Sequence, residues 1–388
     1  MTPIRIVADE NMPGLAPFEA LGTVRRVDGR RLTRIDLADT EVLLVRSVTR
    51  VDRALLEGTP VRFVGSATIG TDHVDRAALK AMGVAFAHAP GCNARAVAEY
   101  VLQALLLACR EQGRTLRDSS VGIVGLGNVG SRVAQWLSAL GVTVLACDPP
   151  LQRAGADTVV PLTDLDTVLA ADLVTLHVPL TRQGPDATFH MLDRERLSRL
   201  GPRQTLLSTC RGAVVDNQAL RERLTDADAP LVLLDVWEGE PRIDAGLLTR
   251  VRLGSPHVAG YSVEGKWLGT AMLHQAFRLW RGESAGVPVM AGERPILEHP
   301  VANEGDLLML LRRAYRIDDD DRRLRASVDD IDPGRAFDAL RRDYPPRHEL
   351  HHWRHRGEAT PALGALLSLL FDPPGAGSAM PAPALDRP

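Results

Sequence analysis

The chain has 388 residues, of which 45% are apolar and 24% are charged, so it is long enough for two or three globular domains that each bury a core. Its formal net charge of −3 gives no electrostatic reason to expect nucleic acid or a membrane as a partner. The four cysteines lie far apart without a CxxC pair, which argues against a disulfide framework or a structural zinc site. The first residues lack the basic and apolar segments of a signal peptide, and the expected location is the cytoplasm.

Strand-like apolar runs alternate with helix patterns in the first part of the chain. This alternation predicts a parallel sheet covered by helices on both faces, and ligands of such sheets bind beyond the carboxyl ends of the strands. Ser47 and Thr68 follow the second and third runs and are therefore candidates for a binding site, although their interpretation as ordinary turn residues stays equally open. The runs are 4–9, 41–46, 61–65 and 84–88, with a helix pattern at 75–82.

A glycine-rich turn follows the next apolar run. The run ends at Gly125 and opens the pattern Gly125-x-Gly127-x-x-Gly130, after which an amphipathic helix begins. In such a unit the first glycine allows the turn, the second lets the backbone approach a pyrophosphate, and the third lets the helix pack on the strand. The pyrophosphate would lie at the helix N-terminus, where N–H groups favour an anion. The turn, including Asn128 and Val129, therefore predicts a dinucleotide site.

A further strand-like run, 142–147, ends at Asp148. A carboxylate at this place accepts hydrogen bonds from the ribose hydroxyls of adenosine and repels a 2′-phosphate. Pro149, Pro150 and Leu151 come next, so no immediate arginine would attract that phosphate. These residues favour NAD over NADP as the cofactor.

Three later strand ends carry polar groups that suit the oxidation of a 2-hydroxy acid. His257 carries an imidazole, a side chain that can take the hydroxyl proton as a base, and Glu240 could hold that imidazole by a hydrogen bond. Arg211 offers a planar fork that grips a carboxylate by two bonds. Each residue alone also has an ordinary structural interpretation, but their joint placement downstream of the glycine-rich turn favours catalysis. The strand-like runs here are 172–178, 204–209, 231–236 and 251–253.

Two long helix patterns, 94–112 and 262–280, indicate two α/β domains with a cleft between them, a usual place for a small-molecule site. From about residue 287 the pattern changes, and three helix patterns mixed with short strand-like pieces predict a small α+β domain. The tail 372–388 is rich in proline, glycine and alanine and is predicted to be disordered. The three helix patterns are 306–316, 335–342 and 363–370.

Residues 348–352 read His-Glu-Leu-His-His and satisfy the HExxH pattern of zinc proteases, with His355 nearby. A protease site of this kind needs a long helix and a third ligand downstream. Pro346 before the pattern and Gly357 after it leave no room for that helix, and no third ligand stands at the usual spacing. No functional metal is therefore expected, and adventitious binding of nickel or zinc is the better interpretation.

Several motifs resemble the D-isomer-specific 2-hydroxyacid dehydrogenases: the glycine-rich turn, STCRGAVVDN at 208–217, LDVWEGEP at 234–241 and SPHVAGY at 255–261. The resemblance implies an NAD-dependent dehydrogenase with two Rossmann-like, doubly wound parallel-sheet domains, in which Arg211, Glu240 and His257 are catalytic. The residues that it assigns to the cofactor are Gly125, Gly127, Asn128, Val129, Gly130, Asp148, Thr209, Cys210, Asp235 and Gly260, and those that it assigns to the substrate are Ser47, Thr68 and Tyr261.

Further motifs extend the resemblance over nearly the whole chain to one branch of that family: ADENMPG at 8–14, LLVRSVT at 43–49, SATIGTDHVD at 66–75 and APGCNARAVAEYV at 89–101. That branch oxidises 4-phospho-D-erythronate to 2-oxo-3-hydroxy-4-phosphobutanoate in the pathway to pyridoxal 5′-phosphate, and it forms homodimers. The domains implied are a discontinuous substrate-binding domain (1–97 and 260–286), an NAD-binding domain (98–259) and a C-terminal dimerisation domain (287–371).

Two alternatives stay open at this point. One is another member of the same family, such as a phosphoglycerate dehydrogenase. The other is a non-catalytic NAD-sensing scaffold resembling the C-terminal binding protein corepressors, which keep the fold and the three catalytic residues. The Arg46-Ser47 and Thr68 set, which suits a phosphate, and the small C-terminal domain argue against the scaffold.

Overall fold

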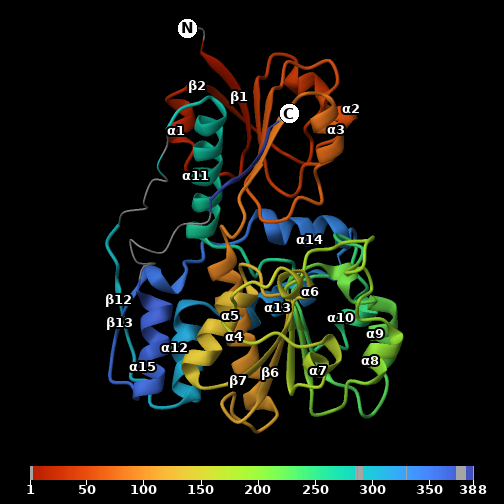
Figure 1. The fold of residues 1–388 in the computed structure, drawn as a ribbon, viewed down its shortest axis with the longest axis vertical. Helices are drawn as coiled ribbons and strands as arrows, with labels where there is room; N and C mark the ends of the chain where they lie inside the picture. The colour runs from red at the N-terminus through yellow and green to blue at the C-terminus, as the bar shows by residue number, and fades with distance from the viewer. Residues whose placement is uncertain (1–2, 285, 287–291, 329, 373–381, 388) are drawn as a thin grey trace. The chain divides into compact units, whose positions relative to one another are not determined.

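The computed structural model describes residues 3–284, 286, 292–328, 330–372 and 382–387. The chain forms two compact units (Figure 1): unit 1 comprises Met1–Asn93, Ser262–Gly292 and Pro374–Pro388, and unit 2 comprises Ala94–Tyr261 and Glu293–Pro373. Each unit contains a six-stranded sheet whose strands are parallel, apart from one edge strand in unit 1. The α/β fold with two doubly wound parallel sheets is therefore confirmed.

The sheet of unit 1 separates two clusters of buried apolar side chains, one on each face. Its central strands are buried at every position, because helices cover both faces of a parallel sheet of this kind. The long helix α11 (Val263–Trp280) packs on one face, where the rings of Phe277 and Phe63 meet edge to face with centroids 5.2 Å apart. In sheet order the strands are β14 (Ala384–Asp386), β5 (Ala85–His88), β4 (Phe63–Ser66), β3 (Val42–Val45), β1 (Ile4–Asp9) and β2 (Gly22–Val27).

The end of the chain adds the edge strand β14 to this sheet. Leu385 pairs with Ala87 in antiparallel register, and the Arg76 guanidinium donates two hydrogen bonds to Asp386 Oδ2, at 3.0 and 2.6 Å. The composition of residues 372–388 predicts disorder, but residues 384–386 form a β-strand. Tertiary contact is the reason, because β5 offers an open edge to a short segment that has no strong pattern of its own. Residues 373–381 of that tail lie outside the described residues.

All strands of the unit 2 sheet are parallel, and the direction in which the chain adds them reverses after its first two strands. The chain adds β7 on one side of β6 and then adds β8, β9, β10 and β11 on the other side. Ligands of such sheets bind where the strand order reverses, beyond the carboxyl ends of the strands, which here is the end of β6. In sheet order the strands are β11 (Leu253–Gly254), β10 (Leu231–Leu234), β9 (Thr205–Ser208), β8 (Leu173–Leu176), β6 (Ser120–Val124) and β7 (Thr143–Cys147).

Many of the short helices begin directly after an aspartate whose carboxylate accepts the backbone N–H three residues on. An aspartate in this position satisfies one of the N–H groups that a helix start leaves without an intrahelical partner. The helices that begin in this way are α2 (Arg53–Leu56), α3 (Arg76–Ala81), α6 (Pro149–Arg153), α7 (Leu165–Leu169), α8 (Arg194–Ser198), α9 (Asn217–Arg223), α10 (Ala245–Leu248) and α14 (Pro333–Arg342).

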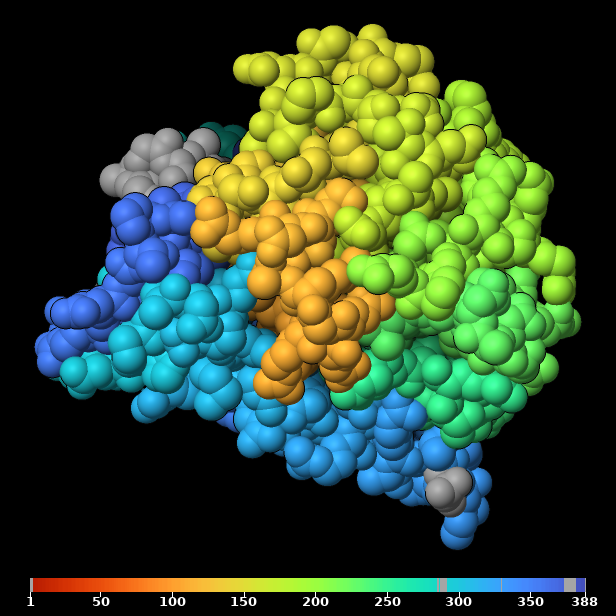
Figure 2. Space-filling view, turned by 90° about the horizontal axis from the view of Figure 1, so that it is seen from below, coloured from red at the N-terminus to blue at the C-terminus, as the bar shows by residue number. Residues whose placement is uncertain are grey.

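The segment from residue 293 to 372, called the C-terminal segment below, shares a hydrophobic core with the rest of unit 2. Its helices α12 (Glu304–Ala314) and α15 (Pro361–Phe371) supply leucines to the cluster that also contains α4 (Ala94–Glu111) and α5 (Gly130–Leu140). Figure 2 shows this cyan and blue segment forming one continuous surface with the orange, yellow and green parts of unit 2. Residues Glu293–Pro373 thus fold onto unit 2 instead of forming the separate body that the composition change suggested.

The helix α13 of the C-terminal segment was not predicted, whereas short strands in this segment were expected. The helix α13 (Ile317–Ser327) has the sequence IDDDDRRLRAS, and its buried positions are Ile317, Asp320 and Leu324. Because one of these positions is an aspartate, the apolar period of a helix is absent and the pattern predicts no helix. The strands β12 (Ile296–Glu298) and β13 (Arg354–Arg356) form a separate two-stranded sheet.

Among the described residues, the helices are either too short or too polar to span a lipid bilayer.

Candidate active site

The glycine-rich turn after β6 is shaped by close contacts. Gly125 has φ of +90°, and a Cβ there would lie 2.8 Å from the carbonyl oxygen of His177. A Cβ at Gly130 would lie 2.0 Å from the carbonyl oxygen of Gly125, so α5 can begin this close to the strand only with glycine. At Gly127 a Cβ would have no atom within 4 Å, so the backbone there faces open space. An accessible backbone at the start of an 11-residue helix suits a pyrophosphate.

Asp148 lies at the carboxyl end of β7, next to this turn. One carboxylate oxygen accepts the N–H of Leu126 in the turn at 2.8 Å, and the other accepts the N–H of Leu151 at 3.1 Å. These bonds hold the carboxylate in place, and each oxygen keeps a second lone pair for a hydroxyl group. The structure therefore places Asp148 where the sequence predicts a ribose-binding carboxylate.

His257 and Glu240 form a hydrogen-bonded pair. His257 Nδ1 lies 2.8 Å from Glu240 Oε2, and the other oxygen of Glu240 accepts the N–H of Trp237 at 2.8 Å. Burial alone would raise the pKa of Glu240, but the imidazole of His257, the charge of Arg341 and the Trp237 N–H together hold that pKa below its ordinary value. The carboxylate is thus kept ionised as the partner of the imidazole.

The loop that carries His257, residues 255–261, is held by Asp235 and is called the His257 loop below. The carboxylate of Asp235 is 1% exposed and accepts the Ser255 hydroxyl at 2.6 Å and the N–H groups of Val258 and Ala259 at 2.8 and 3.1 Å. Burial raises the pKa of Asp235 in spite of these donors. His257 itself has φ of +58°, a left-handed conformation that costs a non-glycine residue about 1 kcal/mol and often marks functional loops.

Arg211 follows β9, the strand next to β10 in the sheet, and its Nη1 donates to the carbonyl oxygen of Cys210 at 2.7 Å. The next residue, Gly212, allows a close approach to the β10 loop, because a Cβ there would lie 1.9 Å from the carbonyl carbon of Trp237. Thr209, Cys210 and Asp235 are buried at the ends of the same two strands. The loops that carry Arg211, Glu240 and His257 therefore follow three neighbouring strands, β9, β10 and β11.

The remaining predicted residues belong to both units. In unit 1, Ser47 is exposed beyond β3, and the Thr68 hydroxyl beyond β4 donates to the carbonyl oxygen of Gly70 at 2.9 Å. In unit 2, Gly260 and Tyr261 are half-buried at the end of the His257 loop. The carboxyl-end positions predicted for Ser47 and Thr68 are observed, since the preceding strands are adjacent and parallel.

Two features near these residues were missed in the sequence analysis. His177 follows β8, and burial lowers its pKa to about 3, so its imidazole is neutral. Its Nε2 lies 3.0 Å from Thr175 Oγ1. Lys266, in unit 1, has its pKa lowered to about 8 by burial and by the positive charge of Arg46. Lysine stands at only two positions of the chain, 80 and 266, which is a signal that could have drawn attention to it.

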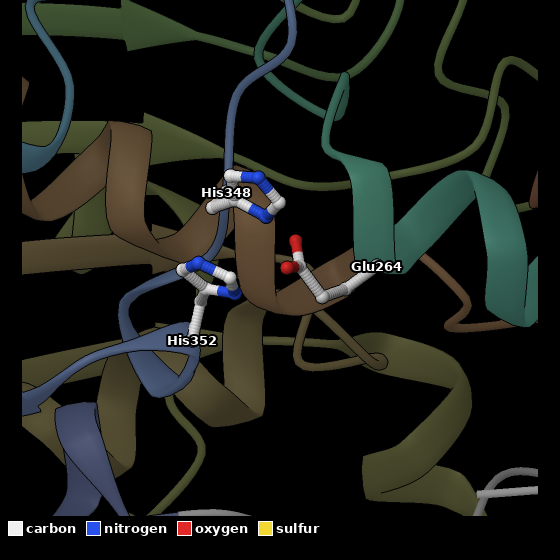
Figure 3. A group of neighbouring side chains, drawn as sticks. All are labelled: Glu264, His348 and His352. Carbon is white, nitrogen blue, oxygen red and sulfur yellow. The ribbon is translucent and has the colours of Figure 1, made fainter. Parts of the chain in front are cut away.

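The HExxH pattern does not form the helix of a zinc protease. Leu350–His352 is a single 3-10 turn, and Glu349 is in extended conformation before it. The rings of His348 and His352 stack on each other with centroids 3.8 Å apart (Figure 3), and His351 has its pKa lowered to about 3, chiefly by burial. The pattern thus arises from a loop and not from the helix of a metalloprotease.

Comparison with known proteins links this geometry to one enzyme family. Residues 93–259 match the model of the NAD binding domain of D-isomer specific 2-hydroxyacid dehydrogenases. The chain is 48% identical over 358 residues to the erythronate-4-phosphate dehydrogenase of Marinobacter nauticus, covering 89% of this chain and 92% of the relative. It is 45% identical over 380 residues to the enzyme of the same name from Azotobacter vinelandii, covering 95% and 99%.

Solved structures show the same fold. The D-lactate dehydrogenase of Aquifex aeolicus, complexed with NAD and lactic acid, superposes with a TM-score of 0.60 at 24% identity and covers 72% of this chain and 96% of its own. The NAD-dependent formate dehydrogenase of Staphylococcus aureus, in complex with NAD, gives a TM-score of 0.60 at 23% identity and covers 74% of this chain and all of its own. NAD is the cofactor, and the open backbone at Gly127 fits it.

The position of Asp148 leads to a prediction about cofactor choice. We expect Asp148→Ala to bind NAD roughly 10- to 100-fold more weakly, because the ribose hydroxyls lose their acceptor, and to narrow the preference for NAD over NADP. Fluorescence titration with both cofactors measures this change. Asp164→Ala is the matched control, since Asp164 caps α7 in the same way without facing the glycine-rich turn. Equal affinity of the unsubstituted protein for NAD and NADP would contradict the assignment.

Proposed function

The chain belongs to the erythronate-4-phosphate dehydrogenase family, and from this premise we propose that it oxidises 4-phospho-D-erythronate to 2-oxo-3-hydroxy-4-phosphobutanoate in the pathway to pyridoxal 5′-phosphate. The observation that carries the proposal is the 2.8 Å contact between His257 Nδ1 and Glu240 Oε2, on loops at the carboxyl edge of an NAD-binding sheet. All four cysteines are buried and none forms a disulfide among the described residues, which agrees with a cytoplasmic location.

The proposed role of His257 is to take the proton of the C2 hydroxyl group. The Glu240 carboxylate accepts the Nδ1–H of the ring, so Nε2 carries the lone pair and faces the substrate as a base. As the proton arrives, the ring becomes positive and the adjacent carboxylate stabilises it. NAD, when bound, supplies the acceptor for the hydride that leaves C2, so the alcohol loses one proton and one hydride and becomes a ketone.

Arg211 is proposed to bind the substrate carboxylate. Its guanidinium is planar, carries five N–H donors and matches a carboxylate by two parallel bonds. The bond from Nη1 to the Cys210 carbonyl fixes the orientation of the group next to β10. A substrate whose carboxylate is held there presents its C2 atom to the Glu240–His257 pair.

The 4-phosphate is proposed to bind residues of unit 1, and Tyr261 is proposed separately as a substrate contact. Ser47 offers an exposed hydroxyl group beyond β3, and the Thr68 hydroxyl beyond β4 would exchange the Gly70 carbonyl oxygen for the phosphate as its acceptor. Arg46 and Lys266 supply positive charge in the same unit, and the pKa of Lys266 is lowered first by burial and then by repulsion from Arg46. A phosphate dianion would relieve that repulsion and accept hydrogen bonds from the hydroxyl groups.

The last part of the proposal concerns the assembly of two chains. A homodimer is proposed, with the C-terminal segment as its interface. Apolar side chains of that segment, Ile296 on β12 and Met309 on α12, are 40% and 51% exposed, which suits a surface that a second copy covers.

The base can be tested with His257→Gln. We expect kcat to fall by about 100- to 10,000-fold because proton transfer loses its positioned base, while NAD binds with unchanged affinity. Steady-state kinetics and a cofactor titration measure the two effects. His355→Gln is the control, since that imidazole lies in the C-terminal segment beside the His299 carbonyl oxygen and should leave kcat unchanged. Near-normal turnover by His257→Gln across the pH range would exclude the role given to this residue.

The phosphate site predicts selectivity. Erythronate should be used far less well than 4-phosphoerythronate, because removal of the phosphate removes hydrogen bonds to a charged group, each worth about 1.5–3 kcal/mol. Ser47→Ala combined with Thr68→Val should reduce the ratio of the two kcat/KM values. Thr59→Val, which removes a hydroxyl elsewhere in unit 1, should not change it. Equal use of both acids by the unsubstituted enzyme would return the protein to the broader family of 2-hydroxyacid dehydrogenases.

If the C-terminal segment is the dimer interface, two similar surface substitutions should affect the mass of the protein in solution differently. Met309→Asp should shift light-scattering masses from two chains toward one, because a charge would be buried in the interface. Val159→Asp, at a residue that is 52% exposed in the NAD-binding part, should leave the mass unchanged. A mass of one chain for the unsubstituted protein would refute the homodimer.

A further inference from the structure

Arg347, in the C-terminal segment, bonds to the backbone of two separate parts of unit 2. It is 5% exposed, and its two terminal nitrogens donate to the carbonyl oxygen of Ala259 in the His257 loop and to that of Ala96 in α4, each at 2.8 Å. The guanidinium also stacks on the ring of Tyr315, 3.8 Å from the centroid. Because a guanidinium is planar and carries its donors in a fixed fork, these contacts hold the two carbonyl groups at one separation.

Ala259 is held on both sides of its Cα atom. Its N–H donates to the Asp235 carboxylate at 3.1 Å, and its carbonyl oxygen accepts from Arg347 at 2.8 Å. Because each peptide group is planar, fixing the two groups that flank Ala259 also fixes the two backbone dihedral angles between them. A carboxylate accepts hydrogen bonds and cannot donate to a carbonyl oxygen, so Arg347 supplies a contact that Asp235 cannot supply.

The His257 loop needs to be held because His257 has φ of +58°, a conformation that residues other than glycine rarely adopt. Such a residue keeps its conformation only where the surrounding structure fixes it. His257 is two residues before Ala259, so freedom at Ala259 would reach the backbone of His257. The distance of 2.8 Å between His257 Nδ1 and Glu240 Oε2 would then no longer be fixed.

The part of α4 that receives Arg347 is polar although it is buried. Glu99 is 5% exposed, and its Oε2 lies 3.9 Å from Arg347 Nη2. Gln103, one turn further along α4, is 2% exposed, donates to the Tyr315 carbonyl oxygen at 2.8 Å and accepts the N–H of Ile317 at 3.1 Å. Apolar residues would pack here at a lower cost of desolvation, so the polar ones indicate that the C-terminal segment must dock on α4 in one register.

We propose that Arg347 is a positioning residue for the reaction, which fixes the carbonyl group of Ala259 and thereby holds the His257 imidazole against Glu240. The inference rests on the proposed function, since it takes His257 as the base. It gives the C-terminal segment a part in catalysis within the same chain, in addition to its proposed part in assembly.

Steady-state kinetics of Arg347→Met test the inference, because methionine replaces much of the side chain without offering a donor. We expect kcat for 4-phosphoerythronate to fall about 10- to 100-fold, since a small displacement of a catalytic group costs turnover on this scale. KM should stay within about 3-fold, because an interaction that acts only in the transition state lowers kcat and kcat/KM equally. Arg347→Lys should recover part of the loss, since an ammonium group donates hydrogen bonds but lacks the fixed fork.

Arg294→Met is the matched control for general damage to the C-terminal segment. Among the described residues, the Arg294 guanidinium donates to the carbonyl oxygens of His351, Trp353 and Phe371, all within that segment. Its replacement should lower the melting temperature, while kcat and KM stay within about 2-fold of the unsubstituted enzyme. A loss of kcat as large as that of Arg347→Met would show that loosening the segment is enough, and it would overturn the inference.

A double-substitution cycle with His257→Gln separates positioning of the base from damage elsewhere in the site. If Arg347 acts through His257, Arg347→Met should lower the remaining turnover of the His257→Gln enzyme by less than about 3-fold, because the base that it positions is already absent. Full additivity of the two losses, or an Arg347→Met enzyme with kcat within about 2-fold of the unsubstituted value, would overturn the inference.

Should Arg347→Met fail to fold, Arg347→Lys takes its place in the cycle, and an unchanged kcat or full additivity with His257→Gln would overturn the inference equally. Oxidation of a different 2-hydroxy acid would overturn the proposed substrate alone, and the same cycle would then be measured with that acid. A chain that oxidises no 2-hydroxy acid would overturn the proposed function and the inference together, whereas an active chain with additive losses would overturn the inference alone.

Discussion

The buried carboxylate of Asp235 is the interaction on which the catalytic geometry depends. It receives the Ser255 hydroxyl and two backbone N–H groups of the His257 loop, and the carbonyl oxygen of the same residue receives the N–H of His257. Loss of these donors would leave a charge buried without partners, which costs several kcal/mol, so the loop has one stable conformation. That conformation keeps His257 at φ of +58° and brings its ring to Glu240.

Residues outside the NAD-binding motifs also hold the His257 loop by hydrogen bonds. Tyr100, on α4, places its hydroxyl 2.8 Å from that of Ser255, and Trp237 donates its indole N–H to the Ser255 carbonyl oxygen at 2.9 Å. Arg347 holds Ala259 from the other side. The C-terminal segment shares its core with α4 and α5, so the packing that stabilises unit 2 also fixes the loop that carries the proposed catalytic base. Stability and catalytic geometry are therefore coupled in this unit.

The sequence predicted well wherever one short segment contains its own physical reason. The strands β6 and β9 are recognisable because short apolar runs form them, and the glycine-rich turn because Gly125 and Gly130 each meet a local steric limit. Prediction failed where the reason lies in a partner. The helix α13 buries Asp320 against two tyrosine hydroxyls, and β14 is a strand only because β5 offers its edge. Neither partner can be read from the segment itself.

The sequence by itself determined the parallel α/β architecture, the dinucleotide turn, the carboxylate at Asp148 and the types of the catalytic residues, because spacing and side-chain chemistry are enough for each. Only the tertiary structure decided that the Asp235 carboxylate holds the His257 loop, because the hydrogen bonds between them join two strand ends that meet only in the folded sheet. It likewise placed Arg341 beside Tyr261, since contact between residues 80 positions apart depends on how α14 packs and not on any local pattern.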